Sequence, residues 1–269
     1  MDDRVKVTMS DGVADVRLVR ADKMNALDAA MFDALVATSG RLAHEKGLRA
    51  VVLSGEGRAF CAGLDMDRFA AMKKGGNRVA GGESRDLTAR THGLTNFPQQ
   101  AVWGWRQLPV PVIAAIQGVA FGGGFQLALG ADMRFLAPDA RMSIMEIKWG
   151  LVPDMAGTPI LASLVRDDIL RELTYTGRIF SAQEALSYGL ATRICDDPRA
   201  AAFEVAREIA GKSPEAIRAA KRMLNNLAID PGPALLAESV EQMKLMGGAN
   251  QLEAVRANID KRAPRFADV

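Results

Sequence analysis

The sequence predicts an α/β fold, in which a layered core of strands and helices is followed by a helical C-terminal region. Short apolar segments that end at glycine or proline alternate with helical periodicities over the first two thirds of the 269 residues. From about residue 158 the pattern becomes almost entirely helical. We therefore expect an α/β core over residues 1–197 and a helical region over residues 198–269.

The first predicted elements are strands. Residues 5–9 and 13–19 alternate apolar and polar side chains, and Ser10-Asp11-Gly12 between them is typical of a hairpin turn. Residues 49–55 form a short apolar run that ends in a glycine, which predicts a strand buried on both faces.

A helix is predicted between these strands. Leu27, Met31 and Leu35 recur at four-residue spacing, so they share one face of a helix. Asp28 is the expected N-cap, and Gly47 is the expected end.

The middle of the chain is predicted to alternate again. Residues 67–92 indicate a helix and then a glycine-rich surface loop, and residues 94–107 indicate another helix. Two further buried strands are expected at 112–116 and 132–136. The remaining pattern predicts a short strand at 191–195 and helices at 159–174, 182–189, 199–211, 214–226 and 232–248.

Composition and charge exclude several classes of function. The net charge is +2 with no long basic run, so we expect no nucleic-acid partner. The two cysteines, Cys61 and Cys195, and the two histidines, His44 and His92, match no metal or nucleophile motif. We find no signal peptide and no apolar run long enough for a membrane span, and we expect a soluble cytoplasmic protein. Acid-base chemistry must then come from carboxylates.

Three consecutive glycines, Gly122, Gly123 and Gly124, follow the strand at 112–116 and precede a helical segment. Such a loop lets an anion approach unpaired backbone N–H groups at the start of a helix. Neither a dinucleotide fingerprint nor a P-loop is present. The open alternatives are an oxyanion hole and tight packing of strand against helix. If the helix begins at Gly123 or Gly124, Gln126 lies on the same face as the Gly123 N–H.

Several segments, in order along the chain, resemble the crotonase (enoyl-CoA hydratase/isomerase) superfamily. Residues 54–65 are similar to its first oxyanion segment, and residues 113–132 are similar to its second. Smaller similarities lie in Lys23-Met24-Asn25-Ala26-Leu27, in Thr176-Gly177-Arg178 with Ala182, Ala185, Gly189 and Leu190, and in Lys261-Arg262-Ala263-Pro264-Arg265-Phe266.

The resemblance implies a core of repeated ββα units, a C-terminal region that mediates trimerisation, and a homotrimer or homohexamer. It implies an acyl-CoA thioester substrate, with coenzyme A as part of the substrate and no separate cofactor or metal. The thioester oxygen would accept hydrogen bonds from the N–H groups at the positions of Leu64 and Gly123. The other positions expected at coenzyme A are Lys23, Met24, Ala26, Ala62, Asp65, Met66, Gly122 and Phe266.

The acid-base positions differ from the two-glutamate pattern of the hydratases. Glu146 matches the second glutamate, but Gln126 stands at the first, and an amide does not exchange protons at ordinary pH. Asp154 follows Pro153 where the hydratases usually have glycine, and the dienoyl-CoA isomerases carry an aspartate there. The resemblance thus implies proton transfer by Glu146, with Asp154 as a second acid.

Three functions remain open. Double-bond isomerisation through Glu146 is slightly favoured, because one glutamate can lift a proton from one carbon and return it to another. The alternative is hydration by Glu146 with Gln126 positioning the water or substrate. A third possibility is an acyl-CoA-binding protein without catalysis.

Overall fold

A computed structural model describes residues 4–67, 70, 86–225 and 232–265, and its centre is a mostly parallel β-sheet. The strands of this six-stranded sheet lie in the order β1 (Val5–Ser10), β2 (Val13–Leu18), β3 (Ala50–Gly55), β4 (Val112–Ile116), β6 (Met133–Leu136) and β9 (Arg193–Ile194). Only β1 and β2 pair in antiparallel fashion, as the predicted hairpin requires. A second sheet has the order β5 (Val119–Phe121), β7 (Arg141–Ser143) and β8 (Phe180–Ser181).

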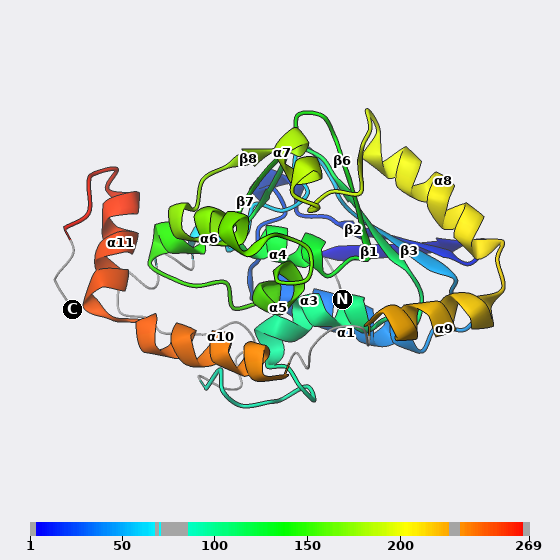
Figure 1. The fold of residues 1–269 in the computed structure, drawn as a ribbon, viewed down its shortest axis with the longest axis horizontal. Helices are drawn as coiled ribbons and strands as arrows, with labels where there is room; N and C mark the ends of the chain where they lie inside the picture. The colour runs from blue at the N-terminus through cyan, green and yellow to red at the C-terminus, as the bar shows by residue number, and fades with distance from the viewer. Residues whose placement is uncertain (1–3, 68–69, 71–85, 226–231, 266–269) are drawn as a thin grey trace.

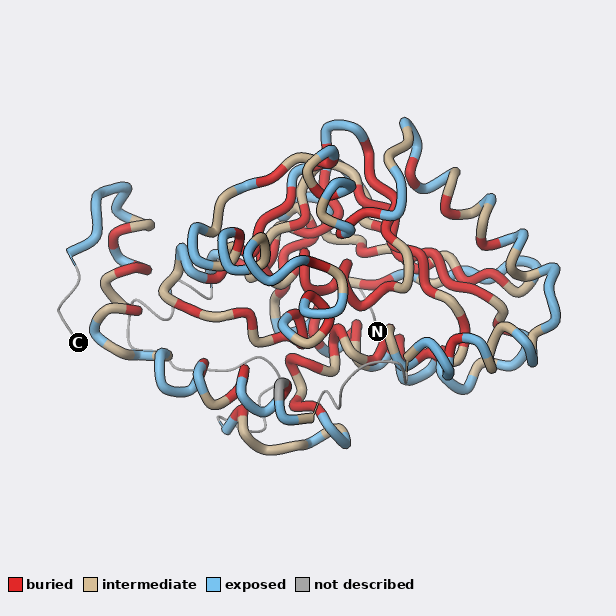
Figure 2. The backbone as a smooth tube through the Cα atoms, viewed as in Figure 1, coloured by how far each residue is buried: buried red, intermediate tan, exposed pale blue. Residues whose placement is uncertain are grey.

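Helices cover both faces of the larger sheet (Figure 1). Leu53 belongs to the apolar cluster that packs on α1 (Ala29–Ala43), α3 (Phe97–Gln107) and α4 (Gly123–Leu129). Val52 belongs to the cluster on the other face, against α8 (Pro198–Ala210). Strands buried in this way on both faces are apolar throughout, which is why the sequence pattern located them. Figure 2 shows that burial is concentrated in these strands and the helices beside them.

The helix ends follow from local hydrogen bonds. The Asp28 side chain accepts from Met31 N–H at 2.8 Å, so the predicted N-cap of α1 is confirmed. The helix stops at Ala43 with His44 as C-cap, so Gly47 does not end it. Asn96 and Gln99 form a reciprocal capping box, which starts α3 later than the predicted residue 94.

The predicted helix at 159–174 is wrong as a single element. The segment forms two helices, α5 (Gly157–Leu161) and α6 (Asp167–Thr176). A short 3₁₀ helix, η2 (Glu146–Trp149), precedes them. Asp167 and Asp168 in the first turn of α6 favour a new helix start, since acids stabilise the positive end of the helix dipole.

The C-terminal helices are α9 (Pro214–Asn225), α10 (Gly232–Leu245) and α11 (Ala249–Ile259). The helix expected at 232–248 is α10, which ends at Leu245, and the sequence did not predict α11. Gly247, with a positive φ of 78°, separates the two helices. α10 packs against α5, and α11 packs against η2. The division after residue 197 stays a prediction, although α8 lies on the sheet of the core.

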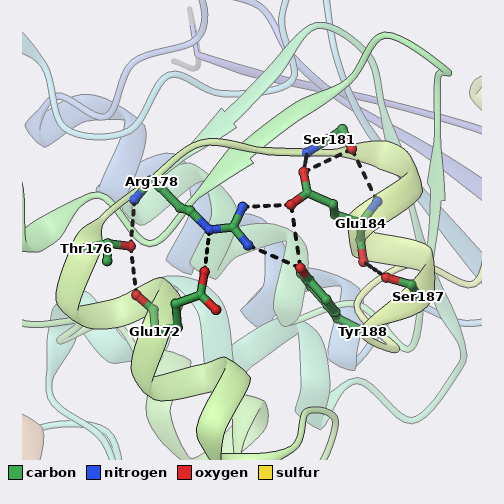
Figure 3. A network of polar contacts seen from close by, with 7 residues as sticks. All are labelled: Glu172, Thr176, Arg178, Ser181, Glu184, Ser187 and Tyr188. Atoms are coloured by element: carbon green, nitrogen blue, oxygen red, sulfur yellow. Dashed lines mark hydrogen bonds and ion pairs between the residues drawn. The ribbon is translucent and has the colours of Figure 1, made fainter.

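A polar network joins α6 to α7 (Ala182–Ser187) and involves the predicted Thr176-Gly177-Arg178 segment (Figure 3). Arg178 forms ion pairs with Glu172 at 2.8 Å and Glu184 at 2.7 Å, and it donates to Tyr188 Oη at 3.1 Å. The neighbouring Gly177 carbonyl accepts from Ser143 Oγ at 2.8 Å, which ties this turn to β7.

Candidate active site

A cavity of about 550 Å³ opens between the glycine loop, the loops at 22–27 and 62–66, and the C-terminal helices. Its walls include most of the positions that the sequence indicated: Lys23, Met24, Ala26, Ala62, Leu64, Asp65, Met66, Gly122, Gly123, Glu146 and Asp154. Gln126 is not among the lining residues, and Phe266 lies outside the described residues. The topology therefore brings together positions that are up to 131 residues apart, from Lys23 to Asp154.

The glycine loop forms one wall of the cavity. Gly122 has φ 49° and ψ −121°, a backbone conformation that side chains with a Cβ rarely adopt. Its N–H donates to the Ser143 carbonyl at 3.0 Å, which fixes the loop against β7. Helix α4 then begins at Gly123, within the interval expected from the sequence.

The loop that carries Leu64 lies directly against this wall. Cys61 pairs with Ala120, and a Cβ placed on Gly63 would lie 3.7 Å from Gly123 N. Within the part of the chain that the structure describes, neither the Leu64 N–H nor the Gly123 N–H donates to another group. Two unpaired N–H groups beside a cavity can bind one oxygen that carries developing negative charge.

Buried Asn25 holds the loop at 22–27 in place. Its side-chain Nδ2 donates to the Glu56 and Ala59 carbonyls at 3.0 and 2.9 Å, while its Oδ1 accepts from Arg20 N–H at 2.9 Å. Met24 and Asn25 both have positive φ, at 50° and 55°, so the chain turns sharply here. The turn presents residues 22–24 to the cavity.

An ion pair between Arg20 and Asp65 lies beside the loop at 22–27. Arg20 Nη1 lies 2.5 Å from Asp65 Oδ2, and it also donates to the Ala26 carbonyl at 2.9 Å. Burial works to raise the pKa of Asp65, but hydrogen bonds from Asp67 N–H and Arg20 outweigh it and lower the pKa. Asp65 thus stays ionised as a structural partner of Arg20.

Glu146 is 9% exposed and lies where β7 passes into η2. Its Oε1 accepts a hydrogen bond from Gln126 Nε2 at 2.7 Å, and its Oε2 is buried with no hydrogen-bond partner among the described groups. Burial raises the pKa of Glu146 to about 7, and the charge of Asp154 adds to the rise while the Gln126 hydrogen bond opposes it. A carboxyl with a pKa near neutrality can both accept and return a proton.

Gln126 does not point its amide at the cavity. Its Oε1 accepts from Met155 N–H at 2.9 Å and from Gly157 N–H at 3.0 Å, while its Nε2 donates to Glu146. Both ends of the amide are thereby engaged, and the side chain is 1% exposed. Gln126 therefore lies behind the cavity wall, where it binds Glu146 and Met155, and it does not itself line the cavity.

Asp154 is a half-buried carboxyl that lines the same cavity as Glu146. Burial raises the pKa of Asp154 to about 7, and a hydrogen bond from Gln242 opposes the rise. Gln242 and Met246, from the C-terminal helices, also line the cavity. The sequence offered no signal for these two residues, because they follow Asp154 by about ninety positions and belong to no motif.

Cys61, Trp103 and Trp105 have structural roles. Cys61 is fully buried, and burial raises the pKa of its thiol to about 12, so it packs as an apolar residue. Trp105 is fully buried in the main core, and Trp103 packs against the same core. Neither tryptophan lines the cavity. The described residues contain no group of three or more side chains suited to a metal ion, and none of their helices is long and apolar enough to cross a membrane.

Comparison with known proteins shows the family of the chain. The family model described as enoyl-CoA hydratase/isomerase matches residues 8–269. The chain is 32% identical to a carnitinyl-CoA dehydratase of Proteus mirabilis, over 99% of both chains. It is 31% identical to the mitochondrial Delta(3,5)-Delta(2,4)-dienoyl-CoA isomerase of Mus musculus, over 93% of this chain and 77% of the other.

The fold is also that of solved members. A crystal structure of an enoyl-CoA hydratase/isomerase from Pseudoalteromonas atlantica matches with a TM-score of 0.82 and 28% identity, over 98% of this chain and 99% of the other. The predicted crotonase-like α/β fold with a helical C-terminal region is therefore confirmed. The chain belongs to the enoyl-CoA hydratase/isomerase family, the crotonase superfamily, and is an enzyme of that class.

Proposed function

We propose that this enzyme moves the double bond of an enoyl-CoA thioester, with Glu146 as the group that takes and returns the proton. One observation carries the proposal: Glu146, a buried carboxyl with one oxygen bound by Gln126 and the other without a hydrogen-bond partner among the described groups, lines the same cavity as two unpaired N–H groups. The pKa of Glu146, raised to about 7 by burial, suits a group that must act as base and then as acid.

The proposed reaction starts from a 3-enoyl-CoA. The Glu146 carboxylate removes a proton from C2, and the electron pair moves into the thioester carbonyl to give a dienolate. The N–H groups of Leu64 and Gly123 stabilise the resulting oxyanion, and each such donor contributes about 3–4 kcal/mol. Protonated Glu146 then returns the proton to C4, which leaves the double bond between C2 and C3.

Asp154 is proposed as a second acid for extended substrates. It lines the cavity with Glu146, and burial raises its pKa to about 7. A dienoyl-CoA presents two carbons between which a proton must move over a longer distance, so a second carboxyl at a different point of the cavity suits that chemistry.

Hydration remains the second candidate, because relatives include a dehydratase. It requires a group that holds and activates water besides Glu146. Gln126 is poorly placed for that task, since its carbonyl accepts two backbone N–H groups and its side chain does not line the cavity. This arrangement favours isomerisation over hydration assisted by Gln126.

The substrate's coenzyme A is proposed to lie along the loops at 22–27 and 62–66. Lys23 lines the cavity there and supplies a positive charge for a phosphate group. We also propose that the enzyme assembles as a homotrimer or homohexamer, as expected from the resemblance.

Assays with 2-enoyl-, 3-enoyl- and dienoyl-CoA test the proposal. Conversion of 3-enoyl- or dienoyl-CoA to the conjugated 2-enoyl or 2,4-dienoyl product, without net addition of water, is the expected result. Water addition to 2-enoyl-CoA at high turnover would favour hydration. If Glu146→Gln left every measured rate unchanged, Glu146 would not be the group that transfers the proton; binding of acyl-CoA with no turnover by the unmodified protein would favour the third possibility, binding without catalysis.

A further inference from the structure

The backbone after Asp154 carries four consecutive N–H groups that two side chains share in alternation. The first and third, from Met155 and Gly157, donate to Gln126 Oε1 at 2.9 and 3.0 Å. Gln126 reaches this segment from α4, and the other end of its amide donates to Glu146 at 2.7 Å.

The second and fourth N–H groups go to a residue outside the predicted site. Ala156 N–H donates to Glu238 Oε2 at 2.9 Å, and Thr158 N–H donates to Glu238 Oε1 at 2.8 Å. Glu238 lies on α10 and is 5% exposed, and Gln99 Nε2 also donates to its Oε2 at 3.2 Å. Both oxygens of this carboxyl are therefore committed to holding the segment.

This arrangement sets the orientation of the Gln126 amide. An amide can rotate so that its carbonyl and its NH₂ exchange places. Two N–H donors at Oε1 prevent that rotation, so the NH₂ end must face Glu146. If residues 155–158 moved, the Gln126 amide could turn so that its carbonyl oxygen faced Glu146. Two hydrogen-bond acceptors would then face each other, and Glu146 would lose its donor.

We propose that Glu238 is a positioning residue that holds residues 155–158 and thereby keeps the Gln126 N–H on Glu146. The catalytic consequence rests on the function proposed above, while the orientation of the amide does not. Glu238 acts from the C-terminal helical region on a carboxyl that it does not touch. The same contacts link α10 to the loop of Asp154, so the C-terminal region forms part of the active-site support.

The direction in which the pKa of Glu146 moves distinguishes a positioning role of Glu238 from a direct effect of its charge. Burial raises the pKa of Glu238 to about 8, and the charged groups that act on it are Asp154 and Arg90. At a pKa of about 8, Glu238 is mostly uncharged near pH 7, and any negative charge that its replacement removes can only lower the pKa of Glu146. Losing the Gln126 hydrogen bond, which favours the charged form, raises it.

Glu238→Gln is the test, because it keeps the size of the side chain and places an NH₂ against one of the two N–H donors. Glu241→Gln is the matched control: the same change on the same helix, at an exposed position. The protonation of Glu146 is followed by infrared titration of its carboxyl stretch, isolated by subtracting the spectrum of the same protein with Glu146→Gln. No substrate is needed for this measurement.

We expect the Glu146 titration to move up by about one pH unit in Glu238→Gln, the change expected when one hydrogen bond to the charged form is lost. It stays in place in Glu241→Gln. An unmoved or lowered titration in Glu238→Gln would overturn the positioning role. Glu238→Asp keeps a carboxylate but is too short to hold both N–H groups, so it gives the same sign and serves if the glutamine variant does not fold.

Turnover of 3-enoyl-CoA gives the second readout. With the Glu146 pKa moved from about 7 to about 8, kcat at pH 7 should fall about fivefold and recover at pH 9, with KM unchanged. Equal losses at every pH, or a loss confined to KM, would contradict positioning. If the unmodified enzyme turns over no enoyl-CoA, the proposed function fails, and the infrared titration still decides the role of Glu238.

Discussion

Gln126→Glu tests most directly whether Gln126 controls the protonation of Glu146. It rebuilds the pair of carboxyl groups seen in the two-glutamate pattern, at a position where the Gln126 nitrogen lies 2.7 Å from Glu146 Oε1. The new carboxylate would keep the N–H donors of Met155 and Gly157, which favour its charged form. Glu146 has no such donor at Oε2, so the proton of the pair should reside on Glu146.

The repulsion can be worked from the observed distance. Two unit charges 2.7 Å apart repel by about 6 kcal/mol at an effective dielectric constant of about 20. That energy corresponds to more than about four pKa units, so the pair should keep one proton throughout the neutral range. Glu146 would then be unable to act as base, and activity would fall at least about tenfold at pH 7 without recovering by pH 9.

The assay is the pH dependence of kcat for 3-enoyl-CoA isomerisation, with Gln126→Met as control. The methionine variant removes the amide hydrogen bond without adding a carboxyl. The apparent pKa on the acid side of its kcat–pH profile should therefore rise by only about one pH unit. A Gln126→Glu enzyme that isomerises 3-enoyl-CoA at the unmodified rate at pH 7 would refute the reasoning. It would mean that Glu146 is not the base or that Gln126 does not control it.

Three further predictions concern stability and geometry. Because burial raises the pKa of Glu146 from 4.5 to about 7, the stability linked to its protonation is present below pH 4.5 and lost as pH rises to 7, by about 3 kcal/mol. Glu146→Gln should therefore raise the Tm at pH 8 more than at pH 4.5, and equal effects at both values in calorimetry would contradict this. Gly122→Ala should lower the free energy of unfolding by about 1–3 kcal/mol and lower kcat, because its Cβ would occupy a positive-φ site 3.4 Å from Glu146 Oε1. Urea titration measures the loss. The control Gly40→Ala, with open space around its Cβ, should be neutral or stabilising in that titration. Asn25→Ala should destabilise by about 1–3 kcal/mol and raise KM for acyl-CoA, since the Glu56 carbonyl and the Arg20 N–H lose their hydrogen bonds to Asn25. An unchanged urea midpoint would contradict this expectation.

The fold could be predicted where local chemistry decides it. The period of Leu27, Met31 and Leu35 and the cap at Asp28 located α1, and the all-apolar run at 112–116 located β4. Strands of two or three residues, such as β8, carry too few side chains to show a period. The break between α5 and α6 depends on packing against other elements, which a periodic pattern does not reveal.

The sequence predicted which residues belong to the site better than it predicted how their side chains are oriented. Sequence position indicated Leu64, Gly123 and Glu146, and all three line one cavity. The expectation that Gln126 would face the bound group came from helical spacing alone. The direction of its amide depends on N–H groups about thirty residues later and on Glu238 from α10, and no local pattern encodes such long-range contacts.

Analysis of the product formed from 3-enoyl-CoA tests the proposed function most directly. Purified enzyme is mixed with 3-enoyl-CoA, and the products are separated and identified by mass and by the absorbance of the conjugated thioester. The proposed mechanism predicts 2-enoyl-CoA of unchanged mass from the unmodified enzyme and none from Glu146→Gln. Unreacted 3-enoyl-CoA, together with rapid formation of the hydrated product from 2-enoyl-CoA, would contradict it.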